Sequence, residues 1–162
     1  VNEGTYFSVS VPLKIDRDVS GEKSDSTVRP TVDMHRKMAL LVEDNELNME
    51  IAEFLLEGEG MIVVKASNGK EAVEKFAASE VGGFDIIFMD VMMPVMNGLD
   101  AARKIRSMTR ADAQTIPVIA MTANAFQDDV QRSFEVGMNA HITKPLDINK
   151  IREAITDVMT KK

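Results

Sequence analysis

Apolar and polar positions alternate in short blocks along residues 37–162, and this pattern predicts strands and helices in turn. Short apolar runs, typical of buried strands, lie at 38–42, 62–66, 85–90, 117–122 and 140–142. Segments with helical periodicity lie between and after them, at 46–57, 69–78, 99–108, 127–136 and 148–159. Strict alternation of strand and helix predicts an α/β fold whose parallel sheet is covered by helices on both faces.

In the first predicted helix, the apolar residues Leu47, Ile51, Phe54 and Leu55 share one face. That spacing is typical of a helix that packs one side against a core. Gly58 and, two residues later, another glycine end the pattern.

The region before residue 37 has a different character. Residues 14–36 are polar, mixed in charge and without apolar periodicity, which indicates a linker. Residues 5–13 alternate apolar and polar side chains and predict a half-buried edge strand. We therefore divide the chain into a short N-terminal piece (1–13), a linker (14–36) and one compact domain (37–162).

Composition excludes several classes of protein. The net charge of -7 argues against nucleic-acid binding through a basic face. The chain has no cysteine, so it holds neither a disulfide framework nor a thiolate metal site. No apolar run approaches the roughly 20 residues that cross a bilayer, and we expect no direct membrane contact. The chain begins at Val1, and we expect it to be a piece of a longer protein.

Polar residues stand where the predicted strands end. Glu43 and Asp44 follow the first strand, and Asp90 ends the third. Thr122 ends the fourth strand, and Lys144 follows the fifth. The carboxyl ends of parallel strands meet at one edge of an open α/β sheet, so we expect these side chains to lie together.

Three neighbouring carboxylates repel one another unless a cation lies among them. Oxygen ligands without histidine or cysteine suit Mg²⁺. A threonine hydroxyl and a lysine ammonium beside that ion could orient the oxygens of a phosphoryl group while a carboxylate attacks it. The sequence therefore predicts a magnesium-dependent phosphoryl site.

Four ordered motifs give the chain a family resemblance. They are the stretches at 41–45 (LVEDN), 89–98 (MDVMMPVMNG), 119–125 (IAMTANA) and 143–146 (TKPL). Together they resemble the response-regulator receiver domain of two-component signalling. The resemblance implies a flavodoxin-like sheet of five parallel strands in the order 2-1-3-4-5, with five helices.

The resemblance also implies a role for the acidic residues. Asp90 is then the phosphoacceptor, and Asp44 binds Mg²⁺ directly. Glu43 acts mostly through metal-bound water, and Met92 offers the metal its backbone carbonyl.

Three further residues complete the expected site. Thr122 and Lys144 are expected to grip the phosphoryl oxygens. His141 stands three residues before Lys144, at a switch position where the family usually has an aromatic residue. Receiver domains promote their own phosphorylation and dephosphorylation, so the resemblance leaves open whether the chain counts as an enzyme.

Residues 3–13 are similar to the last strand of a histidine-kinase ATP-binding domain. With the linker, this indicates the C-terminal receiver of a hybrid histidine kinase, although the kinase catalytic site is absent from this chain. The expected partner is the dimerisation and phosphodonor domain of a histidine kinase or a histidine phosphotransfer protein. We expect a cytoplasmic domain, whose parent kinase can be membrane-anchored, and a homodimer if the N-terminal strand pairs with a second copy.

The same residues also bear on several alternative functions. A stand-alone response regulator fits the same motifs. An aspartyl-phosphate phosphohydrolase of the haloacid-dehalogenase type needs a second aspartate two residues after the nucleophile, where this chain has Met92. A phosphorylation-independent interaction domain would not need Glu43, Asp44 and Asp90 together. A nucleic-acid-binding regulator is disfavoured because only three residues follow the last predicted helix.

Overall fold

Residues 32–123 and 127–160 are described by the computed structural model. The strands are β1 Met38–Val42, β2 Ile62–Ala66, β3 Ile86–Asp90, β4 Val118–Thr122 and β5 Ala140–Thr143. The helices are α1 Glu46–Gly58, α2 Gly69–Ala78, α3 Gly98–Arg106, α4 Gln127–Glu135 and α5 Ile148–Thr160. Each bound lies within two residues of the one expected from the sequence.

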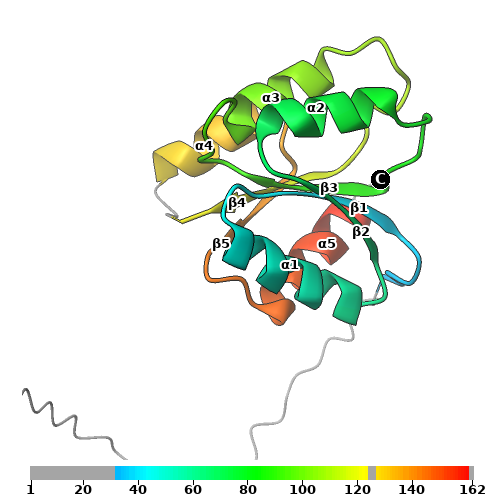
Figure 1. The fold of residues 1–162 in the computed structure, drawn as a ribbon, viewed down its shortest axis with the longest axis vertical. Helices are drawn as coiled ribbons and strands as arrows, with labels where there is room; N and C mark the ends of the chain where they lie inside the picture. Colours follow the sequence, from blue (N-terminus) through cyan, green and yellow to red (C-terminus); the bar gives the residue numbers. More distant parts are fainter. Residues whose placement is uncertain (1–31, 124–126, 161–162) are drawn as a thin grey trace, which may run out of the picture.

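The five strands form one parallel sheet in the order β2-β1-β3-β4-β5. Helices α1 and α5 cover one face, and α2, α3 and α4 cover the other (Figure 1). The two faces carry separate apolar clusters, one joined by α1 and α5 and one by α2 and α3. The expected doubly wound fold and strand order are confirmed.

Three helices begin at an asparagine that caps them. The side chains of Asn45, Asn68 and Asn97 accept hydrogen bonds from the backbone N–H three residues further on, at 2.8–3.0 Å. Such a cap stabilises a helix by about 1 kcal/mol, because it accepts a hydrogen bond from a backbone N–H that has no partner within the helix. The caps therefore fix where α1, α2 and α3 leave the edge of the sheet.

The packed face of α1 differs from the apolar face seen in the sequence. Leu47 and Phe54 are 64% and 76% exposed, and Ile51 is also exposed, so the interpretation was wrong for these three residues. The fourth, Leu55, is half-buried against the cluster beneath the helix. Met49, Ala52 and Leu56 are buried instead. The helix carries two apolar stripes, and the stripe with the small Ala52 at its centre is the one that packs against the sheet.

The chain joins the domain before the first strand. Met34 is only 6% exposed and packs in the cluster beneath α1 and α5. The N–H of Arg36 donates to the carbonyl of Gly60 at 2.8 Å, and Lys37 pairs with Asp85 at 2.9 Å. These contacts lie at the edge where the strands begin. The predicted strand at 5–13 and most of the predicted linker fall outside the described residues.

At this same edge, Arg110 and Asp112 join two loops. The Nε atom of Arg110 donates to Asp112 at 2.6 Å, and the N–H of Gly82 donates to the other carboxylate oxygen at 2.7 Å. The guanidinium of Arg110 also lies over the ring of Phe76, 4.2 Å from its centre. The hydrogen bond from Arg110 is the main reason why the pKa of Asp112 falls to about 2.

Candidate functional site

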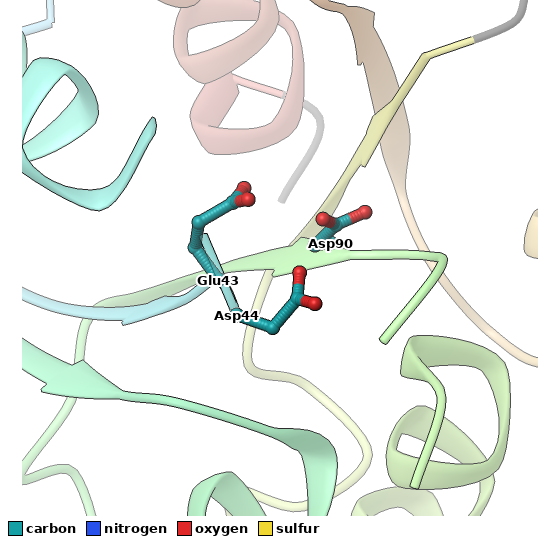
Figure 2. A group of neighbouring side chains, drawn as sticks. All are labelled: Glu43, Asp44 and Asp90. Atoms are coloured by element: carbon teal, nitrogen blue, oxygen red, sulfur yellow. The ribbon is translucent and has the colours of Figure 1, made fainter. Parts of the chain in front are cut away.

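The acidic residues meet at the carboxyl edge of the sheet. Glu43 and Asp44 follow β1, Asp90 is the last residue of β3, and Figure 2 shows the three carboxylates gathered around one space. One oxygen from each lies within 4.8 Å of the others. The predicted convergence of the three carboxylates is therefore present.

Lys144 joins two of these carboxylates. Its ammonium lies 2.5 Å from Glu43 Oε2 and 2.6 Å from Asp90 Oδ2. Glu43 and Asp90 are buried, with 2% and 4% of each residue exposed, whereas Asp44 is exposed. A buried carboxylate is costly without a cation, so Lys144 offsets much of the charge that the strands place here.

Burial and ion pairing shift the pKa values of Asp90 and Lys144 in opposite directions. Burial raises the pKa of Asp90, and the hydrogen bonds from Lys144 and from the N–H of Met92 only partly offset it. Burial by itself lowers the pKa of Lys144, but hydrogen bonds to Asp90 and Glu43 outweigh this effect and raise it. Lys144 therefore stays protonated at neutral pH, as an electrostatic partner must.

Asn48 is a site residue that the sequence analysis missed. Its side-chain nitrogen donates to Glu43 Oε1 at 3.1 Å, while Lys144 holds the other oxygen of that carboxylate. Both oxygens of Glu43 are thus occupied and its orientation is fixed. An asparagine in the first turn of a helix that follows two acidic residues is the sequence signal that points to it.

The loop after Asp90 is held tightly against the sheet. The N–H of Met92 donates to Asp90 Oδ1 at 3.0 Å, and the N–H of Gly98 donates to the carbonyl of Val91 at 3.0 Å. A Cβ atom on Gly98 would lie 2.1 Å from the carbonyl oxygen of Asp90, so only glycine fits there. The side chain of Met92 points to solvent and is 76% exposed.

Thr122 and His141 lie on the last two strands. Thr122 ends β4 and is buried, and its carbonyl accepts the N–H of Lys144 at 2.8 Å. His141 pairs in register with Ala120, two residues before Thr122. Its ring meets the edge of Phe134 with the ring centres 6.1 Å apart. The structure thus places His141 beside the strand that ends at the site.

The donor set suits a small, hard cation. Three carboxylates supply oxygen atoms, one of the three residues is open to solvent, and no histidine or cysteine is among them. Mg²⁺ prefers such oxygen ligands and keeps several waters, so a partly open cluster fits it. The residues present are therefore compatible with the expected metal.

Comparison with known proteins gives the family. Residues 39–156 match the response regulator receiver domain. The chain therefore belongs to the receiver domain family of two-component and phosphorelay signalling.

The chain is similar to parts of several much longer histidine kinases. The chain is 37% identical over 141 residues to probable histidine kinase 2 of Oryza sativa subsp. indica, an alignment that covers 80% of the chain and 13% of the rice protein. It is 33% identical over 159 residues to the peroxide stress-activated histidine kinase mak2 of Schizosaccharomyces pombe, covering 94% and 7%. Histidine kinase 5 of Arabidopsis thaliana is 30% identical over 178 residues, covering 95% and 19%. The chain thus spans less than a fifth of each of these three proteins.

Solved structures agree with the fold. The receiver domain of a Pseudomonas aeruginosa sensor histidine kinase, with magnesium coordinated in its active-site cleft, has a TM-score of 0.68 and 32% identity, covering 76% of this chain and 98% of that one. The Saccharomyces cerevisiae receiver domain of Ssk1, in complex with the histidine phosphotransfer protein Ypd1, has a TM-score of 0.67 and 28% identity, covering 78% and 92%. Within the described residues, no helix combines the length and the hydropathy of a membrane span.

Proposed function

We propose that Asp90 accepts a phosphoryl group from a phosphohistidine, with Mg²⁺ held by Asp44, Asp90, Glu43 and the carbonyl of Met92. The observation that carries this proposal is the meeting of three carboxylates with the ammonium of Lys144 at the edge where the strands end. When bound, the ion neutralises charge on the phosphoryl oxygens.

The chain's own residues have distinct tasks in the proposed transfer. A carboxylate oxygen of Asp90 forms a bond to phosphorus as the phosphorus–nitrogen bond of the donor breaks, and that electron pair stays on the imidazole nitrogen. Burial favours this attack because it leaves the carboxylate weakly solvated, and Asp90 is only 4% exposed. Lys144 lies 2.6 Å from Asp90, so its charge is in place before the phosphoryl oxygens arrive.

Thr122 and His141 supply the proposed response. The hydroxyl of Thr122 would bind a phosphoryl oxygen and move toward it, which opens space that the ring of His141 can fill. The new group adds about -1.5 to -2 charge at this edge. We infer that the surface made by α4, β5 and α5 then changes, as a shift between states a few kcal/mol apart.

We further propose that the chain is the C-terminal receiver of a hybrid histidine kinase, with a kinase remnant at 1–13, a linker at 14–36 whose end from Met34 packs against the domain, and the receiver at 37–162. The curated histidine kinases support this origin. The partner would be a kinase phosphodonor domain or a histidine phosphotransfer protein, the class to which Ypd1 belongs in the Ssk1 complex. The proposed location is the cytoplasm.

Labelling by a small-molecule donor tests the central proposal. The chain is incubated with Mg²⁺ and acetyl phosphate, and the intact mass is measured for an added phosphoryl group of about 80 Da. The wild type should gain one acid-labile group, and Asp90→Asn should gain none. Stoichiometric, acid-labile labelling of Asp90→Asn would show that the acceptor lies elsewhere.

A further inference from the structure

Arg106, the last residue of α3, joins three segments of the chain. Its Nε atom donates to the carbonyl of Gly137 at 2.9 Å, and its Nη1 atom donates to the carbonyl of Ala113 at 2.8 Å. Its Nη2 atom donates to the carbonyls of Ile116 and Gly137 at 2.8 Å, and to Oδ1 of Asn139 at 3.0 Å. One side chain therefore holds the end of α3, the loop before β4 and the turn between α4 and β5.

The partners of Arg106 differ from those of other arginines in the domain. Arg110 and Arg152 pair with carboxylates, whereas Arg106 forms no ion pair among the described residues and meets only uncharged oxygen atoms. Burial lowers the pKa of Arg106, although a guanidinium stays charged in proteins. The C-terminal ends of α3 and α4 favour a cation, because each carries the negative end of a helix dipole. The position thus requires several donors in one rigid plane, which lysine does not have.

The end of α4 is shaped to receive this side chain. Gly137 has a φ of 87°, in the left-handed region, and the N–H groups of Gly137 and Met138 donate to the carbonyls of Phe134 and Ser133 at 2.9 and 3.0 Å. This bonding pattern ends a helix at a glycine. A Cβ atom on Gly137 would lie 3.1 Å from Nε of Arg106, so the glycine also leaves room for the guanidinium.

Asn139 extends the contact to the sheet. Its Oδ1 atom accepts a hydrogen bond from Arg106 and another from the N–H of Val118, the first residue of β4, at 2.8 Å. Its own N–H donates to the carbonyl of Val118 at 2.8 Å. The turn after α4 is therefore fixed both to α3 and to the edge where β4 begins, and Thr122 lies at the other end of that strand.

This arrangement limits how α4 can move. The helix, Gln127–Glu135, begins five residues after Thr122 and ends at the contact with Arg106, so it spans about 14 Å between the two. A rigid helix that is fixed at one end can tilt about that end but cannot slide along its axis. Its displacement is then largest near Gln127 and smallest near Gly137.

We propose that Arg106 is a positioning residue that fixes the C-terminal end of α4, so that the response to phosphorylation is a tilt of the helix about this end. The inference rests on the proposed function, in which Thr122 moves toward the phosphoryl group. Because the same contact holds Asn139, the backbone at the start of β5 keeps its register, and His141 responds through its side chain. Arg106 thereby confines the response to the part of this surface that is nearest the site.

Amide hydrogen exchange, measured by NMR, tests this inference. Exchange is followed in α4 and at Asn139, with Mg²⁺ alone and with Mg²⁺ and beryllofluoride, a mimic of the phosphoryl group. In the wild type, the mimic should change exchange in residues 130–132 by at least about fivefold, and exchange at Asn139 by less than about twofold.

Two variants and a control separate positioning from stability. Arg106→Lys keeps the charge but has a single nitrogen, so the mimic should now change exchange at Asn139 by about tenfold, the effect of roughly two lost hydrogen bonds. Asn139→Ala removes only the link to β4 and should give a smaller change at Met138, which keeps the proposal testable if Arg106→Lys does not fold. Arg103→Lys is the control, because Arg103 is exposed on the same helix and pairs only with Asp100.

Each outcome supports or overturns the proposal. A purely structural role would raise exchange at Asn139 equally with and without the mimic, so an unchanged ratio in both variants overturns it. A wild-type response at Asn139 as large as that in residues 130–132 also overturns it. Labelling of the wild type by acetyl phosphate keeps the proposed function in either case. Absence of labelling removes the proposed function, and this inference falls with it.

Discussion

Replacing Lys144 by alanine tests how much of the fold depends on the charge balance at the site. In the wild type, one ammonium pairs with Glu43 and Asp90, whose side chains are 1% and 6% exposed. The variant leaves two adjacent carboxylates almost out of water with no cation between them. We therefore expect a loss of stability as well as a loss of phosphorylation.

The magnitude follows from the burial of the three groups. Removing one partner of a buried ion pair costs roughly 3–5 kcal/mol. Lys144 is 18% exposed, so water reaches the pair, and the lower end of the range, about 3 kcal/mol, applies. For a domain of this size that corresponds to a fall in Tm of roughly 10 °C.

The pH dependence distinguishes this cause from a packing defect. The contribution of Lys144 is fully present below about pH 10, the pKa of an unfolded lysine, so it is constant between pH 5 and 8. Without it, the buried carboxylate of Asp90 has a pKa raised further above that of the unfolded chain. A group with a raised carboxyl pKa loses stability as pH rises, so the deficit of Lys144→Ala should shrink as the pH is lowered from 8 toward 5.

The assay is urea unfolding in EDTA at several pH values, repeated with Mg²⁺. The ion should stabilise Lys144→Ala more than the wild type, because it supplies the missing positive charge. Lys65→Ala is the control, since the side chains of the Lys65–Glu53 pair are 49% and 24% exposed and such a surface pair should contribute little to stability. A deficit below about 0.5 kcal/mol, or one that does not change with pH, would refute this account.

Three further outcomes are expected. Asp44→Ala should remove most of the rise in Tm that Mg²⁺ gives the wild type, and equal shifts in differential scanning calorimetry would place the ion elsewhere. Asp112→Asn should lower the free energy of unfolding by up to about 2 kcal/mol at pH 7, because the pKa of Asp112 is lowered to about 2. The difference should shrink to a small fraction as the pH falls from about 4 to 2, and a difference of undiminished size at pH 2 would contradict the prediction. Met34→Ala should lower the free energy of unfolding by about 2–3 kcal/mol, because it removes a buried side chain. Deletion of residues 1–31 should leave the unfolding midpoint unchanged. The reverse result would show that the start of the domain is wrongly assigned here.

The sequence predicted the sheet and the acidic edge because both depend on local pattern. Asp90 ends a run of apolar residues, so its place at the end of a buried strand follows from the pattern alone. The strand order came from the family resemblance. The convergence of Glu43, Asp44 and Asp90 then follows, because parallel strands end at the same edge.

The sequence could not select between the two apolar stripes of α1. Leu47, Ile51 and Phe54 are spaced as a packed face, but Met49, Ala52 and Leu56 have equivalent spacing and are the ones buried. The choice depends on how closely the helix approaches the sheet, which is a tertiary property. The left-handed backbone of Val95, where φ is 68°, was equally hidden, since nothing in the local sequence requires a valine to adopt a positive φ.

The attachment at Met34 has a mechanical consequence. It holds the incoming chain at the edge where the strands begin, and Asp90 lies at the other edge, about 17 Å away along a five-residue strand. A domain that pivots about this attachment carries its acceptor on an arc of that radius. Any turn of the domain about this attachment would therefore move the acceptor without changing the chemistry of the cleft.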